Sequence, residues 1–252
     1  DREISKLETL SAYGSTPFHK QGIRELFEQI MSISRKRQYQ LLNESGRGEQ
    51  MDYTQIAAHD YQGARIVYQG VEGAYSHAAA LQYFGDDADV YHVPSFEDAM
   101  VEVEEGRADY AVLPIENSSA GAVSGNYDNL VMHNLYIVAE TQVSVNHALL
   151  GLKGAVLSDI KRVYSHPQAL MQCQKFLNEH KGWHQVSVEN TAVAAQRVVK
   201  EGDPRKAAIA STMSGSIYGL SVVKAPLNFN SSNTTRFVIT SSRKVYAKTA
   251  SK

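Results

Sequence analysis

The stretch that decides the fold is Tyr136-Ile137-Val138-Ala139-Glu140-Thr141-Gln142-Val143-Ser144-Val145-Asn146-His147-Ala148-Leu149-Leu150. This unbroken run is longer than one strand of a compact sheet needs. It can continue from one sheet into a second, and a late strand at 237–240 can return after another group of strands and helices. We therefore predict two lobes that are joined by a hinge and enclose a cleft.

Strand-like and helix-like segments alternate on both sides of this run. Short β-branched runs predict strands at 65–68, 90–93, 110–113, 136–145, 162–165, 185–188, 207–210 and 237–240. Apolar residues at helical spacing predict helices at 76–84, 96–105, 125–133, 167–180, 191–200 and 212–218. Such alternation is typical of an α/β fold built from parallel βαβ units, whose ligands bind at the carboxyl ends of the strands.

Residues 1–43 show a helical pattern throughout, interrupted by Gly14-Ser15-Thr16-Pro17. Gly14 can end a first helix, and Ser15 or Thr16 can cap a second. Two helices cannot enclose a core, so this segment must pack on a partner chain, on the rest of the protein or on a further helix. Residues 44–63 are polar and aperiodic, which predicts a linker.

The composition excludes several classes of protein. The chain has 252 residues and a formal net charge of −2, which gives no electrostatic reason to expect nucleic acid or an anionic membrane as a partner. No stretch approaches the roughly 20 apolar residues that cross a bilayer. Because the single cysteine, Cys173, cannot form an internal disulfide, we expect a reducing compartment, and the cytoplasm is the simplest choice.

Four junctions between a strand and the next segment are unusually polar. The first is Gln69-Gly70-Val71-Glu72-Gly73-Ala74-Tyr75-Ser76-His77, whose two glycines let backbone N–H groups approach a ligand at a helix start. Its spacing is not that of a dinucleotide fingerprint. The second holds Glu116, Asn117 and Ser118 after an apolar run, where an Asx-type turn is the purely structural alternative.

The third junction places Ser165 and His166 before Pro167, and Gln168 and Gln172 then lie one helical turn apart on the same face. His166 alone would more often be a cap or a buried core residue. The fourth is the segment Asn233–Phe237. These residues could be ordinary strand formers. Arg236 beside threonine hydroxyls also suits a carboxylate, because a guanidinium matches both carboxylate oxygens.

Other signals are weaker. Ser158–Lys161 fits an S-x-x-K pattern but lacks the companion motifs. The nine histidines show no metal-ligand spacing, and Cys173 lies in the middle of a predicted helix. We therefore predict no metal and no cofactor.

Three of these motifs, Pro114–Ser118, Tyr164–Gln168 and Thr235–Phe237, together with Tyr218-Gly219-Leu220, closely resemble those of the prephenate dehydratase family. The resemblance covers residues 64 to about 245. Residues 1–43 resemble the latter part of a helical chorismate mutase domain, through Asp1-Arg2-Glu3 and the segment 30–38. The whole resembles the bifunctional enzymes that join these two domains in phenylalanine biosynthesis.

The resemblance implies a periplasmic-binding-protein-like dehydratase domain that converts prephenate to phenylpyruvate in its interlobe cleft. Thr235 would donate a hydrogen bond to the leaving hydroxyl, and Glu116 or His166 would supply the proton. Arg236 would bind the pyruvyl carboxylate. The remaining predicted substrate-binding residues are Asn117, Ser118, Ser165, Gln168, Gln172, Asn233 and Phe237.

The resemblance also implies a domain plan. Lobe one would span about 64–143 plus 227–245, lobe two about 144–226, and 246–252 would be a tail toward a phenylalanine-binding regulatory domain that we expect to be absent. Arg2, Glu3, Ser34 and Gln38 match part of a mutase site. Because we expect its first helix to be missing, mutase activity should be lost.

Two alternatives remain open from the sequence. The chain could be a non-catalytic two-lobed binding protein, since binders and enzymes share such folds, or it could retain mutase activity. Leu26, Phe27, Ile30 and Met31 form an apolar stripe on residues 22–43, so we expect a homodimer that buries it.

Overall fold

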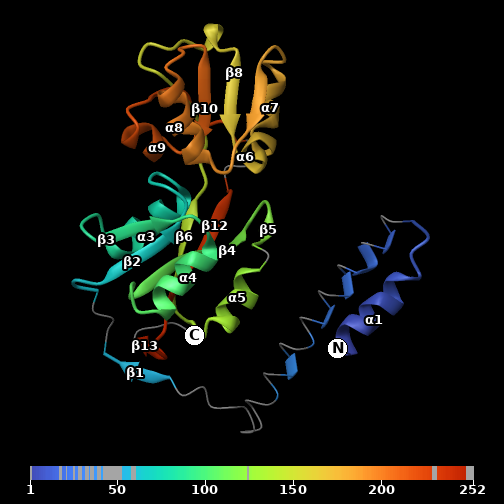
Figure 1. Cartoon of the computed structure of the whole chain (residues 1–252). Coiled ribbons are helices and arrows are strands. Elements are labelled where there is room, and N and C mark those ends of the chain that lie inside the picture. Colours follow the sequence, from blue (N-terminus) through green and yellow to red (C-terminus); the bar gives the residue numbers. More distant parts are fainter. Residues whose placement is uncertain are drawn as a thin grey trace. The chain divides into compact units, whose positions relative to one another are not determined.

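A computed structural model describes residues 2–16, 19–20, 22–24, 26–27, 30–31, 34, 37–38, 41, 53–57, 61–123, 125–228 and 232–247 (Figure 1). The chain divides into two compact units, Asp1–Asp52 and Tyr53–Lys252. The second unit contains all three sheets of the described residues and carries the predicted dehydratase site.

In the first unit, helix α1 spans Arg2–Ser11. The predicted helix break is confirmed, because Thr16 Oγ1 accepts a hydrogen bond from the N–H of His19 (3.1 Å), as a helix cap does. The described residues between 19 and 41 are helical.

The predicted mutase residues lie in this unit. Gln38 Nε2 donates to Ser34 Oγ (3.3 Å) across one helical turn. The side chains of Arg2 and Glu3 lie outside the described part of the chain, so the structure does not test this site.

Lobe one is a sheet with the strand order β3-β2-β4-β12-β6, and β5 pairs with β4 at one side. Its strands are β2 (Arg65–Gln69), β3 (Asp89–Val93), β4 (Tyr110–Asn117), β5 (Gly121–Ala122), β6 (Tyr136–Ser144) and β12 (Thr234–Ser241). Its helices are α3 (Tyr75–Phe84), α4 (Phe96–Glu104) and α5 (Asn126–Met132). Helices α4 and α5 share one apolar core with the sheet, through Met100 and Leu130, and α3 shares the other, through Ala79 and Ala80.

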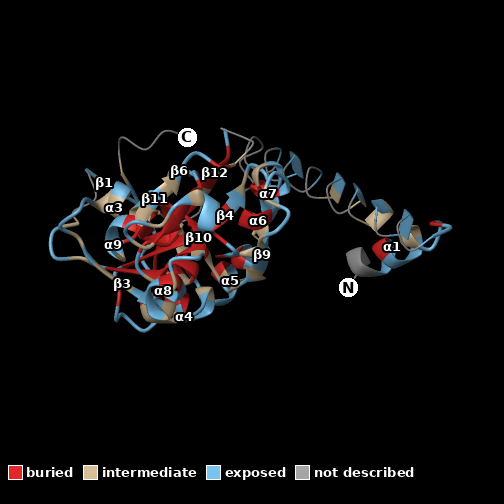
Figure 2. Ribbon diagram, turned by 90° about the horizontal axis from the view of Figure 1, so that it is seen from above, coloured by how far each residue is buried: buried red, intermediate tan, exposed pale blue. Residues whose placement is uncertain are grey.

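Lobe two is a sheet with the order β11-β7-β10-β8-β9. Its strands are β7 (Ala148–Gly151), β8 (Arg162–Ser165), β9 (His184–Ser187), β10 (Lys206–Ala210) and β11 (Ser221–Lys224). Its helices are η1 (Leu157–Asp159), α6 (Pro167–Gln172), α7 (Gln174–Asn178), α8 (Thr191–Glu201) and α9 (Thr212–Ile217). Buried residues again fill both faces of the sheet (Figure 2).

Two segments connect the lobes, as the run 136–150 predicts. The chain leaves lobe one after β6, enters lobe two at β7, and returns between β11 and β12. The two crossings are hydrogen-bonded to each other, since Leu227 N–H donates to the His147 carbonyl (2.9 Å) and His147 N–H donates to Asn228 Oδ1 (3.1 Å). The predicted two-lobed α/β architecture is therefore confirmed.

The structure differs from the prediction in three details. The sheets are mixed, because β12 runs antiparallel to β4 and β6, and β7 runs antiparallel to β10. The predicted helix 167–180 is broken at Cys173 into α6 and α7. The predicted linker contains a short strand, β1 (Thr54–Ile56), that pairs with β13 (Val245–Ala247) at the start of the predicted tail.

Candidate functional site

A cavity of about 480 Å³ lies between the two lobes, beside the carboxyl ends of β2, β4 and β8. Its polar lining residues are Gln69, Tyr75, Ser76, Asn117, His147, His166, Gln168, Gln172, Glu189, Asn190, Thr191 and Thr235. Among the described residues that line it, none is Lys or Arg, and Glu189 is the single carboxylate. An anionic ligand must therefore be held mainly by neutral donors.

The hydroxyl of Thr235 is a free donor at this cavity. Asn117 Nδ2 donates to Thr235 Oγ1 (2.9 Å) and also to the Thr234 carbonyl (3.1 Å), which ties β4 to β12. No described residue accepts a hydrogen bond from the Thr235 hydroxyl. Because one lone pair of Oγ1 is already used, the O–H is left to donate to a ligand.

His166 is both the cap of α6 and a cavity residue. Its Nδ1 accepts a hydrogen bond from Gln168 N–H (3.2 Å), so the neutral imidazole carries its proton on Nε2. Burial lowers the pKa of His166 below its usual value, which favours this neutral form. Nε2–H is thus a second donor, since no partner for it occurs in the described part of the chain.

Gln168 and Gln172 both line the cavity, as predicted from their one-turn spacing. Gln172 Oε1 lies 2.9 Å from His147 Nε2, and the other ring nitrogen of His147 lies 3.2 Å from the Tyr75 hydroxyl. Burial lowers the pKa of His147. This chain of contacts links α3, the first crossing and α6, and so fixes the orientation of Gln172.

Arg236 and Glu116 do not line the cavity, in contrast to their predicted roles. Side chains alternate along a strand, so Thr235 and Phe237 face the cavity whereas Arg236 faces the other side. There the Arg236 guanidinium lies 3.5 Å from the Glu116 carboxylate and 3.6 Å from that of Glu140. Arg236 therefore forms ion pairs with both glutamates, on the face of β12 that points away from the cavity.

Three further predicted residues are also used within the protein. Ser165 is buried and donates to the Ile209 carbonyl (2.6 Å), and Ser118 Oγ accepts from Thr234 N–H (3.0 Å). Asn233 is buried and accepts from Asn117 (2.9 Å). None of the three lines the cavity, and their contacts position the strands that do.

The structure adds seven polar cavity residues that were not predicted as site residues, and four of them, Tyr75, Ser76, His147 and Glu189, bear on the arguments below. Tyr75 and Ser76 belong to the glycine-rich junction after β2, where a helix start beside a ligand was expected. His147 lies in the crossing, in the run that decides the fold. Glu189 follows β9, and only its position at a strand end could have marked it.

Other kinds of site find no support in the described residues. No group of three or more His, Cys, Asp or Glu side chains among them could hold a metal ion. None of the helices described there is long and apolar enough to span a membrane. Burial raises the pKa of Cys173 to about 12, so this thiol is a core residue rather than a nucleophile.

Fold and site together define a two-lobed α/β protein that takes a small, hydrogen-bonding molecule into an interlobe cavity. The family model described as "Prephenate dehydratase" matches residues 66–245, and the chain belongs to this family.

Relatives with curated names extend this comparison. A protein of Arabidopsis thaliana named "Arogenate dehydratase/prephenate dehydratase 1, chloroplastic" is 45% identical over 69% of this chain and 44% of its own length. The Escherichia coli (strain K12) "Bifunctional chorismate mutase/prephenate dehydratase" is 37% identical over 95% of this chain and 60% of its own length. The chain thus spans about half the length of these relatives.

A solved structure has the same architecture. Prephenate dehydratase of Arthrobacter aurescens in complex with L-Phe is 31% identical, with a TM-score of 0.64 over 71% of this chain and 64% of that chain.

Proposed function

We propose that the chain catalyses the decarboxylating dehydration of prephenate to phenylpyruvate. The observation that carries this proposal is the free hydroxyl of Thr235 at the cavity, held by Asn117 so that it can donate. Membership of the prephenate dehydratase family supports the same reaction.

In this reaction the bond between the ring and its carboxylate breaks, and carbon dioxide leaves. The electron pair of that bond moves into the ring, and the C–O bond at the opposite ring carbon breaks. The oxygen leaves with its electron pair and takes one proton to form water. Aromatisation of the ring drives the sequence, so the protein has to place the substrate and stabilise the negative charge that develops on the leaving oxygen.

Thr235 O–H and His166 Nε2–H are the two donors that we assign to this oxygen. A threonine hydroxyl is too weak an acid to be the final source of the proton, so its role is hydrogen bonding. Of the two predicted proton sources, His166 lines the cavity and Glu116 does not. A neutral imidazole N–H is also too weak an acid to give up its proton, so we assign His166 hydrogen-bond donation to the departing hydroxide, which then takes its proton from solvent.

The neutral cavity suits the loss of carbon dioxide. A strong cation beside the ring carboxylate would stabilise the charged ground state and raise the barrier to decarboxylation. The amides and hydroxyls of the described lining can orient the substrate without that cost.

The test is to mix the purified chain with prephenate and to measure phenylpyruvate by its absorbance in base. We expect one phenylpyruvate for each prephenate consumed. Binding of prephenate without turnover would show instead that the chain is a non-catalytic binding protein.

Glu189 favours arogenate as a second candidate substrate. Arogenate carries an ammonium group where prephenate carries a keto oxygen, and a carboxylate at the cavity can pair with an ammonium. We expect Glu189→Gln to lower the ratio of kcat/KM for arogenate to that for prephenate by about tenfold, the size of an ordinary charge-assisted hydrogen bond. An unchanged ratio would remove Glu189 from substrate selection.

We also propose a cytoplasmic homodimer. Leu26 and Ile30 of the first unit are exposed large apolar side chains, and a second copy of the chain can cover them. Light scattering of the purified chain tests this, and a monomer at micromolar concentration would contradict it.

A further inference from the structure

The first turn of α3 opens onto the cavity with its N–H groups unused. The cap residue, Ala74, has no side chain that could accept a hydrogen bond. Ala78 N–H is the first to bond within the turn, to the Ala74 carbonyl (3.0 Å). No described residue accepts from the N–H groups of Tyr75, Ser76 or His77, and Tyr75 and Ser76 line the cavity.

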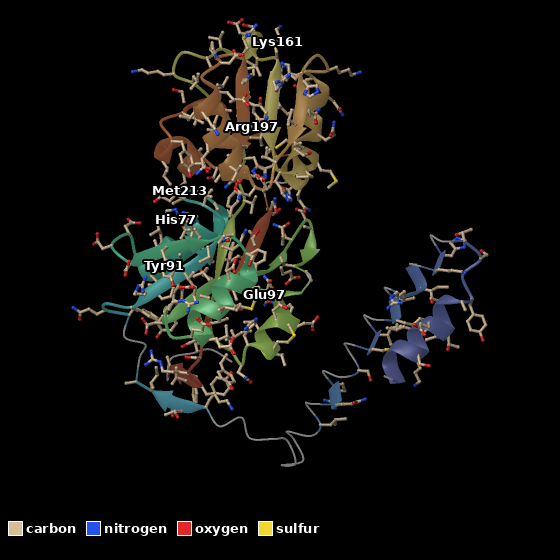
Figure 3. The ribbon with its side chains drawn as sticks, viewed as in Figure 1. His77, Tyr91, Glu97, Lys161, Arg197 and Met213 are labelled. Carbon is tan, nitrogen blue, oxygen red and sulfur yellow. The ribbon has the colours of Figure 1, made fainter. Side chains whose placement is uncertain are left out.

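The N–H groups of a first helical turn have no partner within any α-helix. The residue before the cap, Gly73, holds this turn against lobe two, because its carbonyl accepts from the Ser214 and Ser211 hydroxyls at 2.8 and 3.1 Å. Figure 3 labels His77 and Met213, which belong to the two elements that meet at this contact. Gly73 has φ +81°, and a Cβ there would lie 2.8 Å from Ser214 Oγ, so the turn requires glycine.

Ser76 gives an independent sign of a ligand. The residue is only 7% exposed and lines the cavity, and its hydroxyl forms no hydrogen bond with any described residue. Its Oγ is not fully enclosed by protein, so the cavity is where the hydroxyl can find the partner that such groups normally have. Since the hydroxyl lies at a helix N-terminus with free N–H groups, the missing partner is expected to be an anion.

We propose that the first turn of α3 binds the pyruvyl carboxylate of the substrate, through Ser76 Oγ–H and the backbone N–H groups of Tyr75 and Ser76. This inference rests on the proposed function. The described lining offers no Lys or Arg for a carboxylate, and Arg236 lies on the other face of β12 between two glutamates. The ring carboxylate must be lost, so tight donors serve the carboxylate that is retained.

The experiment measures the KM of prephenate and the competitive Ki of phenylpyruvate, which keeps only the pyruvyl carboxylate. Ser76→Ala should raise both constants about tenfold, as expected for a lost hydrogen bond to a charged group, while kcat stays within about twofold. Ser76→Asp should raise both by more than about a hundredfold, because a fixed negative charge then meets the substrate carboxylate. Ser158→Asp, an exposed serine of lobe two, is the matched control and should change neither constant.

Ser76→Thr keeps the hydroxyl and should restore both constants to within about threefold of the wild type, whereas a merely structural role would not be rescued in this way. Thermal unfolding of each variant checks that it is folded. The proposal is overturned if Ki is unchanged in folded Ser76→Ala, including the case in which KM alone rises. If the wild type does not turn over prephenate, the proposed function fails, and calorimetric binding of phenylpyruvate to the wild type and to Ser76→Ala then decides the subsite separately.

Discussion

Neighbouring polar side chains on the two faces of β12 have different environments. On the cavity face, Thr235 has a hydroxyl whose proton has no acceptor among the described residues. On the other face, Arg236 lies between the carboxylates of Glu116 and Glu140. A guanidinium is the more conspicuous group in a sequence, yet its charge is already balanced within the protein. Because Arg236 Nε is itself a buried donor without a partner among the described residues, the comparison teaches that the face on which a side chain lies marks this site better than its charge does.

The N-termini of two helices of lobe one also differ in whether the protein satisfies their donors. Helix α4 begins with a capping box in which Ser95 accepts from Asp98 N–H (3.0 Å) and Asp98 accepts from Ser95 N–H (3.1 Å). Helix α3 follows the neighbouring strand and has no side-chain cap at all. The protein thus stabilises one helix start with its own side chains and leaves the other open at the cavity.

The largest expected effect separates the two faces of β12. Thr235→Ala should lower kcat for prephenate by about 10²- to 10³-fold, because one donor to a developing oxyanion is removed, and KM should change by less than about threefold. Steady-state kinetics from phenylpyruvate formation measure both. Thr212→Ala, an exposed threonine of lobe two, should behave as the wild type. A fall in kcat of less than about fivefold would contradict the role of the Thr235 hydroxyl.

The second prediction concerns the turn before α3, where Gly73 contacts lobe two. Gly73→Ala introduces a Cβ 2.8 Å from Ser214 Oγ at a residue with φ +81°. We expect the free energy of unfolding to fall by about 2–3 kcal/mol, the sum of left-handed strain and steric overlap, and KM for prephenate to rise.

Gly106→Ala is the matched control for that change. Gly106 has φ +72° with nothing within 4 Å of a Cβ, so an alanine there adds backbone strain without steric overlap. Urea unfolding of both variants measures the difference. Equal destabilisation of the two would show that the contact between Gly73 and lobe two contributes nothing.

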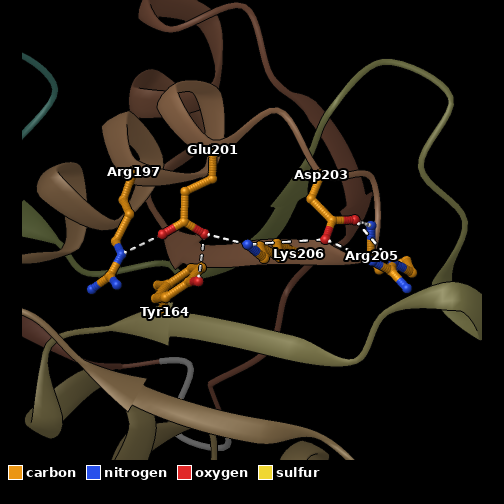
Figure 4. A network of polar contacts seen from close by, with 6 residues as sticks. All are labelled: Tyr164, Arg197, Glu201, Asp203, Arg205 and Lys206. Carbon is orange, nitrogen blue, oxygen red and sulfur yellow. Dashed lines mark hydrogen bonds and ion pairs between the residues drawn. The ribbon is translucent and has the colours of Figure 1, made fainter.

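The third prediction concerns polar groups that are satisfied inside lobe two. Glu201 accepts from Tyr164 Oη (2.6 Å) and Arg197 Nε (2.8 Å) and pairs with Lys206 Nζ (2.8 Å) (Figure 4). Hydrogen bonds from Arg197, Lys206 and Tyr164 lower the pKa of Glu201 to about 2. Since an unfolded Glu has a pKa of about 4.3, this stabilisation is present above that pH and is lost as the pH falls toward 2.

Glu201→Gln should therefore lower the free energy of unfolding by about 1 kcal/mol at pH 7, and the difference from the wild type should shrink between about pH 4.5 and pH 2.5. Denaturant unfolding across this range measures it. Glu179→Gln, an exposed carboxyl of the same lobe, is the control. Dehydratase kinetics at pH 7 should be unaffected in both, and a difference that persists at low pH would contradict the assignment.

Much of this fold could be predicted because it follows local rules. Apolar periodicity located the strands and helices, and the run 136–150 indicated a crossing between lobes. The antiparallel direction of β12 could not be derived, since it depends on how the chain returns through the second crossing. The break at Cys173 lacks a Gly or Pro signal, so no local pattern divides 167–180.

The site could be predicted only in part, because local patterns do not show which side chains face the cavity. Thr235, Asn117, His166, Gln168, Gln172 and Phe237 line the cavity as expected. Strand alternation alone places Arg236 on the opposite face from Thr235 and Phe237. The predicted role of Arg236 relied instead on the match between a guanidinium and a carboxylate. The turn before Ser76 meets lobe two through the contact of Gly73 with Ser214, residues far apart in the sequence, which no local pattern predicts.

The smallest expected effect is the sharpest test of the comparison between the two faces of β12. Arg236→Gln should change the KM of prephenate by less than about twofold, because Arg236 faces two glutamates and not the cavity, and an exposed ion pair of this kind contributes about 0–1 kcal/mol. Arg236→Lys keeps the charge and should match the wild type in both KM and stability. Because Glu116 and Glu140 are left facing each other in Arg236→Gln, that variant should lose a little stability, and added salt should recover it by screening their repulsion. A tenfold or larger rise in KM for Arg236→Gln, with Lys unable to rescue it, would instead make Arg236 the anchor of a substrate carboxylate and would remove the distinction between the two faces.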